Sequence, residues 1–242
     1  LATGNEIGGG PSAGWGRGCD GPFWIAEEGC LAFSDAGNHR RLAWSRDEGV
    51  TEFTGDTRRA LGATRDQVGR VVSCEWATGM VTRQEPGGGV TLIASTFEGR
   101  RLNRPDDVVV APDGSIIFTD VRDPFTDVRE PFAVPQGACV PTSAVYRVTR
   151  DGMSIQMVTD QLEEPSGLVL APDGTTLYVS DGRSREIMSY PVESTGEIDG
   201  QAGTLFARIE GPGHGAPFGL TVDVHGNIYS GGPGGIWILD SS

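Results

Sequence analysis

Five copies of one hairpin pattern constrain the fold of this chain more than any other feature. Each copy has a start residue, a short apolar run, a turn glycine and a second apolar run, as in EEPSGLVLAPDGTTLYVSD at 163–181. Two short apolar runs joined by a glycine turn are typical of a β-hairpin. The five segments are 19–35, 59–75, 104–120, 163–181 and 216–232. Their start residues are Asp20, Leu61, Asp106, Ser166 and Phe218, and their turn glycines are Gly29, Gly69, Gly114, Gly174 and Gly226.

The spacing of the copies predicts how the hairpins assemble. The start residues recur at intervals of 41 to 60 residues, and a third apolar run follows every hairpin. A fourth run follows in some copies, as at 90–95 and 154–160. A period of about 40–50 residues with four short strands per unit indicates a β-propeller. The third runs are 40–45, 79–84, 143–149, 186–192 and 235–240.

We therefore predict an all-β fold, with a Gly-rich N-terminal segment at 1–18 and a single β-propeller domain at 19–242. Five blades can be read from the sequence. A sixth blade is incomplete, truncated or absent, and the sequence leaves these alternatives open. We expect the Pro-rich stretch between Asp120 and Ala144 to form a loop over one face.

Composition limits the partners of the chain. The 37 glycines and 15 prolines suit a fold with many tight turns, and the net charge of −14 argues against nucleic acid and anionic membranes as partners. No apolar run approaches the length of a membrane span. We expect a small-molecule substrate and a cytoplasmic location, with secretion left open. Four cysteines are too few for a disulfide framework. Free buried thiols are therefore expected, and a Cys19–Cys30 pair across one hairpin is the alternative.

The propeller fold would bring the five start residues together, because the first strand of every blade lines the central channel. Asp20, Asp106 and the neighbouring Asp107 would then lie near the hydroxyl of Ser166. Carboxylates combined with a hydroxyl or carbonyl oxygen suit calcium or magnesium better than zinc. Further acids end the second strands, and for Asp35, Asp120 and Asp181 we expect turn capping or arginine pairing.

The sequence resembles the SMP-30/gluconolactonase/luciferin-regenerating family. The resemblance is carried by RRLNRPDDVVVAPDGSIIFTD at 100–120, GRVVSCE at 69–75, PSGLVLAPDGTTLYVSD at 165–181 and GNIYSGGPGGIWILD at 226–240. It implies a six-bladed propeller, many of whose relatives are calcium-dependent lactonases, and it implies that part of a sixth blade is missing from the C-terminus.

The resemblance also implies a metal site with substitutions. Asp20 stands where the family usually has Glu, and Asp106 and Ser166 stand where it has Asn. Phe218 stands where the family has an Asp that is both a ligand and the expected general base, and Trp76 stands where it commonly has His. The implied metal ligands are Asp20, Asp106 and Ser166, and the implied cofactor is Ca²⁺.

Three hypotheses for function follow. The first is a cation-dependent hydrolase of lactones or related cyclic esters. The second is a metal-free enzyme with an apolar pocket, acting by acid/base chemistry on a hydrophobic natural-product-like substrate. The third is a non-enzymatic ligand-binding propeller. A Ser166–His214–Asp nucleophile is a further alternative, although no nucleophile elbow surrounds Ser166. The predicted catalytic residues are Asp106, Asp107, Glu75 and His214, and the predicted substrate-binding residues are Arg104, Asn103, Trp76 and Phe218.

Overall fold

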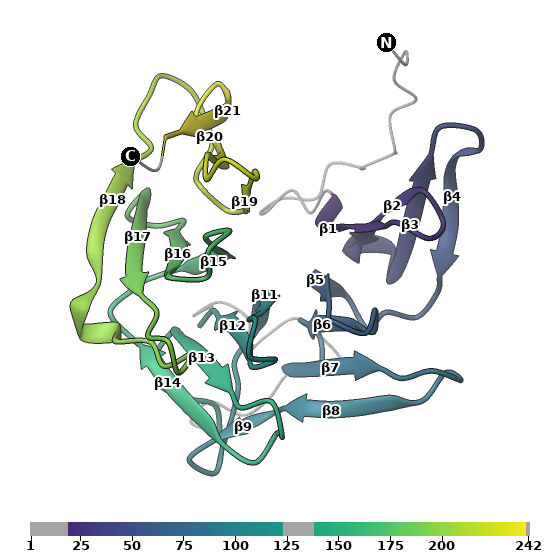
Figure 1. Cartoon of the computed structure of the whole chain (residues 1–242), viewed down its shortest axis with the longest axis horizontal. Coiled ribbons are helices and arrows are strands. Elements are labelled where there is room, and N and C mark those ends of the chain that lie inside the picture. The colour runs from purple at the N-terminus through teal and green to yellow at the C-terminus, as the bar shows by residue number, and fades with distance from the viewer. Residues whose placement is uncertain (1–18, 123–137, 241–242) are drawn as a thin grey trace.

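The computed structural model describes residues 19–122 and 138–240. Five antiparallel sheets are arranged as an arc around a common centre, and the first strand of each sheet lies innermost (Figure 1). The all-β propeller prediction is confirmed. The described residues contain five blades and, apart from one two-stranded ribbon, no further sheet. The predicted segment 1–18 and most of the predicted loop between Asp120 and Ala144 lie outside the described residues.

Four of the five sheets have four strands in chain order. The first contains β1 (Cys19–Ile25), β2 (Cys30–Asp35), β3 (Arg40–Ser45) and β4 (Gly49–Thr54). The second contains β5 (Ala60–Arg65), β6 (Val71–Glu75), β7 (Met80–Gln84) and β8 (Val90–Ala94). The third contains β11 (Pro105–Val110), β12 (Ile116–Asp120), β13 (Ala144–Val148) and β14 (Ile155–Thr159). The fourth contains β15 (Pro165–Leu170), β16 (Thr176–Asp181), β17 (Glu186–Pro191) and β18 (Thr204–Arg208).

The fifth sheet has three described strands, β19 (Leu220–Val222), β20 (Ile228–Gly232) and β21 (Gly235–Leu239). A two-stranded hairpin of β9 (Thr96–Phe97) and β10 (Arg100–Arg101) lies between the second and third sheets in the chain. Two 3₁₀ turns, η1 (Ala36–Asn38) and η3 (Gly200–Ala202), complete the described elements. In this described part of the chain, no helix is long and apolar enough to cross a membrane.

The five predicted turn glycines all adopt a backbone conformation that favours glycine. Their φ angles are 62°, 87°, 86°, 73° and 89° for Gly29, Gly69, Gly114, Gly174 and Gly226. Because a side chain is strained at such angles, the glycines fix where each inner hairpin turns. The predicted hairpins and third strands are therefore confirmed.

Hydrophobic layers fill the space between neighbouring sheets. Val72 and Val81 of the second sheet pack with Phe118 and Tyr146 of the third. The third and fourth sheets meet in a similar layer around Ile117 and Val145, which pack with Leu177 and Val179. A blade in the middle of the arc is thus covered on both faces, which explains why all five side chains of β12 are buried.

The innermost strands share one irregularity. The register slips after the first pair in β5, β11 and β15, between Ala60 and Ala63, Pro105 and Val108, and Pro165 and Leu168. In β1 it slips after the second pair, between Asp20 and Phe23. A bulge of this kind leaves residues without a partner on the neighbouring strand. Leu61, Asp106 and Ser166 lie in these bulges and are free of the regular strand pairing, whereas Asp20 lies at the edge of its bulge and still pairs with Ser34.

The bulges also allow the inner strands to approach one another closely. A Cβ atom on Gly62 would lie 2.5 Å from the Cα of Asp107 and 2.6 Å from the carbonyl oxygen of Asp106. On Gly167 it would lie 2.7 Å from the carbonyl oxygen of Phe218. Real Cβ atoms are essentially never found this close to backbone, so these contacts require glycine. Contacts of this kind connect β1 to β5, β5 to β11 and β15 to β19, and β11 also contacts β15.

Acids at the ends of second strands anchor the loops around them, as expected for Asp35, Asp120 and Asp181. Asp35 accepts hydrogen bonds from Asn38 Nδ2 and Arg40 Nε, both at 2.9 Å. Asp181 accepts from the backbone N–H of Glu163 at 2.8 Å. Asp120 is fully buried, and its Oδ2 accepts from the backbone N–H of Asn103 at 2.9 Å. Its Oδ1 has no hydrogen-bond partner within the described residues.

The cysteine alternative is corrected by the register of the first hairpin. Cys19 pairs with Asp35 and Cys30 pairs with Ile25, so the two thiols lie at opposite ends of the hairpin and cannot form a disulfide. All four cysteines are free. Burial is confirmed for Cys30 and Cys74, whereas Cys19 is exposed and Cys139 is half-buried.

Replacing Gly62 with alanine tests the close approach of the inner strands. The new methyl group must push β5 away from Asp106 and Asp107, so Gly62→Ala should lower the free energy of unfolding by about 1–3 kcal/mol. Urea denaturation measures this change. Gly37→Ala is the matched control, because a Cβ at Gly37 meets no atom within 4 Å. Equal stability of the two variants would contradict the packing described.

Replacing Asp120 with asparagine tests the cost of its burial. Desolvation raises the pKa of Asp120 to about 7, partly offset by hydrogen bonds from Asn103. An unfolded aspartate has a pKa of about 3.9. Between these values the folded protein binds the extra proton, so wild-type stability should fall relative to Asp120→Asn as pH rises, by at most about 1.4 kcal/mol per pH unit.

The comparison is made by urea denaturation of both proteins between about pH 5 and pH 8, and the difference should level off above about pH 7. Asp173→Asn serves as the control, because hydrogen bonds from Thr175 lower the pKa of this exposed carboxyl. A difference between wild type and Asp120→Asn that is constant over this range would show that Asp120 ionises normally in the fold.

Candidate active site

The bulges of three blades bring acidic and hydroxyl groups together near the axis. The carboxylate of Asp106 is within hydrogen-bonding reach of the Ser166 hydroxyl and is close enough to Asp20, Asp107 and Glu164 for their charges to act on it. The Ser166 hydroxyl also lies 3.2 Å from the carbonyl oxygen of Glu164. The structure thus unites the three predicted metal ligands, Asp20, Asp106 and Ser166.

This cluster has an unfavourable charge balance. Burial raises the pKa of Asp106 well above its usual range, and the neighbouring carboxylates raise it further. Burial also raises the pKa of Asp20, whose Oδ1 accepts a hydrogen bond from the Gly21 N–H at 2.7 Å. No ion pair joins Asp20 or Asp106 to an arginine within the described residues. The pair can be accommodated by a shared proton or by a cation.

Asp107 connects two blades beside the cluster. Its Oδ1 accepts from the Val108 N–H at 2.9 Å, and its Oδ2 accepts from the Leu168 N–H of the next blade at 3.1 Å. Burial, followed by the charge of Asp20, raises the pKa of Asp107 to about 7. Because both oxygens are held by backbone, Asp107 fixes β15 against β11 next to the acidic pair.

Glu75 is buried at the end of β6 and is also occupied by hydrogen bonds. Its oxygens accept from Thr78 Oγ1 at 2.7 Å and Thr82 Oγ1 at 2.8 Å, and Arg58 Nη1 lies 3.5 Å away. These contacts hold the carboxylate in place and offset its charge.

A layer of cationic and aromatic side chains lies beside the start of β11. The guanidinium of Arg104 lies 4.0 Å from the ring centroid of Trp76, and that of Arg59 lies 5.5 Å from it. Such distances are typical of cation–π contacts. Arg104 is two residues before Asp106, so this layer borders the acidic cluster. Asn103 instead orders the loop, since its Nδ2 donates to Asp120 at 3.1 Å and to the Thr142 carbonyl at 3.0 Å.

Phe218 and His214 lie on the segment that leads to β19. The Phe218 ring packs over Gly182, where a Cβ atom would lie 2.6 Å from the ring and 3.1 Å from Glu164 Oε2. The ring is 44% exposed, so it presents apolar surface near the acids. His214 is exposed, and no hydrogen bond joins it to Ser166 or Asp106 within the described residues. The Ser166 nucleophile alternative therefore gains no support.

Sequence reasoning missed the hydroxyl groups that hold the bulges. Ser34 Oγ donates to the Leu61 carbonyl oxygen, and Thr119 Oγ1 donates to the Ser166 carbonyl oxygen, both at 2.7 Å and both across a blade boundary. Ser180 Oγ accepts from the Gly167 N–H at 2.9 Å. Each hydroxyl residue directly precedes the acid that ends a second strand, in FSD, FTD and VSD. That repeated pair is the signal that identifies them.

The donor set of the cluster consists of oxygen atoms of the type that hard divalent cations accept. Asp20 and Asp106 offer carboxylate oxygens without an arginine partner, and Ser166 offers a hydroxyl, which are ligands of the kind that calcium accepts together with water. Within residues 19–122 and 138–240, no group of three or more His, Cys, Asp or Glu side chains is arranged to hold a metal ion. Of the three predicted ligands, Asp20 and Asp106 are thus the only carboxylates, and Phe218 offers no side-chain oxygen atom.

Comparisons with known proteins agree with this architecture. The family model described as "SMP-30/Gluconolactonase/LRE-like region" matches residues 19–241. A gluconolactonase from Zymomonas mobilis is 27% identical over an alignment that covers 91% of this chain and 66% of that protein, slightly less than two thirds of its length.

Solved structures with a similar fold also include a gluconolactonase. A gluconolactonase from Xanthomonas campestris is 33% identical with a TM-score of 0.79, covering 92% of this chain and 72% of that one. Regucalcin from Agrobacterium tumefaciens, a calcium-binding protein, is 16% identical with a TM-score of 0.63 over 88% of this chain and 66% of that one, and it shares the fold. The match over nearly the whole propeller shows that this chain belongs to the SMP-30/gluconolactonase/LRE-like family.

Proposed function

We propose that this chain hydrolyses a lactone or related cyclic ester at the axial cluster, with a divalent cation, calcium being the best fit, held by Asp20, Asp106 and Ser166. The observation that carries the proposal is the close pair of carboxylates, Asp20 and Asp106, which has no arginine partner in the described residues. The gluconolactonases to which the chain is 27% and 33% identical supply the reaction class.

The chemistry requires a proton acceptor at the axis. In lactone hydrolysis the oxygen of water bonds to the ring carbonyl carbon, the water loses a proton, and the ring C–O bond breaks to give a hydroxy acid. When bound, the cation would relieve the repulsion between the carboxylates and polarise the lactone carbonyl. Asp106 accepts the proton from water and returns it to the departing ring oxygen. The Ser166 hydroxyl holds Asp106 in position.

The other predicted catalytic residues have supporting roles in this proposal. Asp107 keeps the bulges of β11 and β15 together through its bond to the Leu168 N–H. Glu75 fixes the end of β6, from which Trp76 projects, through Thr78 and Thr82. A direct catalytic role for His214 stays a prediction, since this exposed side chain lies on the loop before Phe218.

Substrate recognition follows from the groups around the acids. Trp76 and Phe218 offer apolar rings that can contact the face of a lactone ring. Arg104, which stacks on Trp76, offers a guanidinium that suits a carboxylate or phosphate on the substrate. We therefore propose a lactone that carries an anionic substituent. Asn103 would contribute by ordering the loop that holds Arg104.

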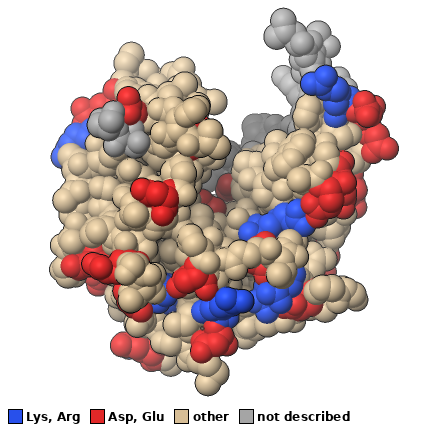
Figure 2. Space-filling view, viewed as in Figure 1, with Lys and Arg blue, Asp and Glu red and all other residues tan. Residues whose placement is uncertain are grey.

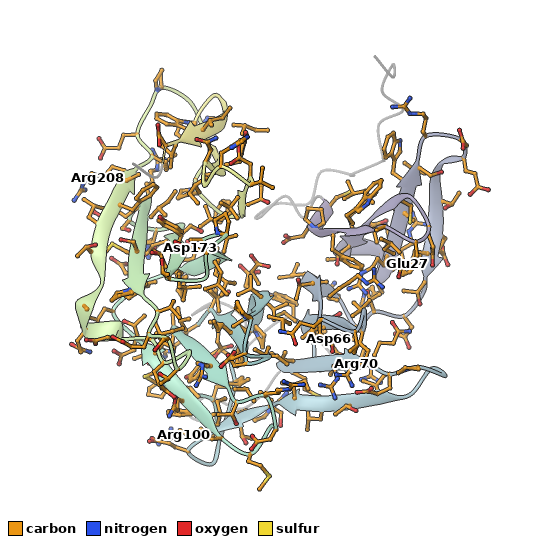
Figure 3. All side chains as sticks on the ribbon, in the orientation of Figure 1. Glu27, Asp66, Arg70, Arg100, Asp173 and Arg208 are labelled. Carbon is orange, nitrogen blue, oxygen red and sulfur yellow. The ribbon has the colours of Figure 1, made fainter. Side chains whose placement is uncertain are left out.

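Chelation together with an Asp106 variant tests the proposed reaction. Hydrolysis of a panel of lactones, followed by proton release, should require Ca²⁺ and stop after EDTA treatment. Asp106→Asn should reduce kcat by about 10²-fold or more, because the proton acceptor is lost. Asp173→Asn, in the turn between β15 and β16, is the control; Asp173 is labelled in Figure 3. Activity that survives EDTA but is lost in Asp106→Asn would favour the metal-free acid/base hypothesis. Full activity both in EDTA-treated wild type and in Asp106→Asn would refute the axial cluster as the active site.

Replacing Arg104 with glutamine tests recognition of the anionic group. The substitution keeps a polar side chain but removes the charge, so kcat/KM for a carboxylate-bearing lactone should fall by about 10- to 100-fold, as expected for a lost charged hydrogen bond. The value for a neutral lactone of the same ring size should change by less than about threefold. An equal loss for both substrates would show that Arg104 has a structural role only.

A further inference from the structure

A pocket lies at the other end of the inner hairpins from the acidic cluster. It has a volume of about 200 Å³ and is formed where the turn after β5 meets the ends of β11 and β13. Asp106 is the second residue of β11 and Val110 is its last, so about 13 Å of strand separates this pocket from the axial site. The turn residues Asp66 and Arg70 are labelled in Figure 3. The lining includes Asp66, Arg70, Arg83, Val110, Ile116 and Arg150.

Three arginines surround the pocket but only two carboxylates pair with them. Arg70 Nε lies 2.7 Å from Asp66, and Arg70 Nη1 lies 3.1 Å from Glu85. Glu85 is shared with Arg83, whose Nε lies 2.8 Å away. Arg150 forms no ion pair with any described residue. The pocket therefore has a surplus positive charge, although the chain as a whole has a net charge of −14.

Some guanidinium nitrogens of these arginines are available to hydrogen-bond a ligand. Within the described residues, Arg70 Nη2 and both terminal nitrogens of Arg83 have no hydrogen-bond partner. The stem of Arg150 is held against the turn of the third blade, since a Cβ atom on Gly114 would lie 2.9 Å from its Cδ. The guanidinium forks of arginine match the oxygens of carboxylate and phosphate groups. In Figure 2, blue side chains gather beside red ones on the lower right of this face.

The rest of the pocket suits a short carbon skeleton. Val110 and Ile116 supply an apolar wall, and Gln67 ties the second blade to the third by donating from Nε2 to the Ala111 and Pro112 carbonyl oxygens at 3.0 and 2.8 Å. A volume of about 200 Å³ corresponds to roughly six or seven water molecules at about 30 Å³ each. The space therefore limits a ligand to a small molecule.

We propose that this pocket binds a small oxyanion, either inorganic phosphate or a short organic acid, through Arg150 together with Arg70 and Arg83. The anion contacts both the second and the third blade, so its binding stabilises the seam between them. This site is separate from the proposed lactone site and goes beyond the proposed function.

Thermal unfolding and calorimetry of the full chain test the proposal. Phosphate and succinate at millimolar concentration, each compared with sodium chloride of equal ionic strength, should raise Tm by several degrees, since a ligand that binds the folded state stabilises it. Stronger binding of phosphate would identify a phosphate site, and stronger binding of succinate a carboxylate site. Arg150→Gln should weaken binding by about tenfold or more.

Arg46→Gln is the matched control, because Arg46 is an exposed arginine in the turn after β3, in the first blade. It should bind as tightly as wild type. Urea denaturation without ligand checks that Arg150→Gln is folded, and its lactone hydrolysis should be unchanged, which separates this site from the proposed active site. The proposal is overturned if neither anion raises Tm more than chloride does, or if folded Arg150→Gln binds like wild type.

Discussion

The close approach of the innermost strands is the constraint on which the rest of this structure depends. Gly21, Gly62 and Gly167 lie so near the backbone of the next blade that a side chain at these positions would clash. The bulges that accompany this contact also release Asp106 and Ser166 from strand pairing, and Asp20 lies at the edge of a third bulge. Packing and site geometry thus have a single origin: the same irregularity that brings the blades together turns their first residues toward the axis.

That arrangement concentrates negative charge. Asp20, Asp106 and Asp107 are half-buried and influence one another, and their pKa values rise. Two backbone N–H groups donate hydrogen bonds to Asp107 and so partly stabilise its negative charge. The negative charges of Asp20 and Asp106 receive less stabilisation from hydrogen bonds, which is the physical reason to expect a cation or a shared proton there. Phe218 supplies no side-chain oxygen ligand, so any cation bound here would be held less tightly than in a site with a third carboxylate.

The sequence was sufficient to predict the five inner hairpins, because the turn glycines and apolar runs repeat in phase. It did not predict the outer strands β4 and β18, since most of their side chains are exposed or half-buried and show no apolar alternation. Other features could not be predicted because they depend on the register between neighbouring strands. A bulge shifts which residues face the axis, so the two-blade role of Asp107 could not be inferred from spacing. The separation of Cys19 from Cys30 likewise became clear only from the pairing of β1 with β2.

The axial cluster and the arginine-lined pocket differ in how far the sequence alone predicts them. Asp20, Asp106 and Ser166 could be named in advance because they occupy equivalent positions in a repeat. Arg70, Arg83 and Arg150 occupy different positions in two blades, so only the packing of those blades brings them together. The hydroxyl residues Ser34 and Thr119 fall between these cases, because their position before an acid repeats but their partners lie in the next blade.

The most direct test of the account is to locate a bound cation by anomalous scattering from a crystal soaked in calcium, or in terbium as a calcium substitute. We predict a single strong peak at the axis, within coordination distance of carboxylate oxygens of Asp20 and Asp106 and of the Ser166 hydroxyl. The absence of a peak there at a saturating concentration, or a peak coordinated by other residues, would contradict it.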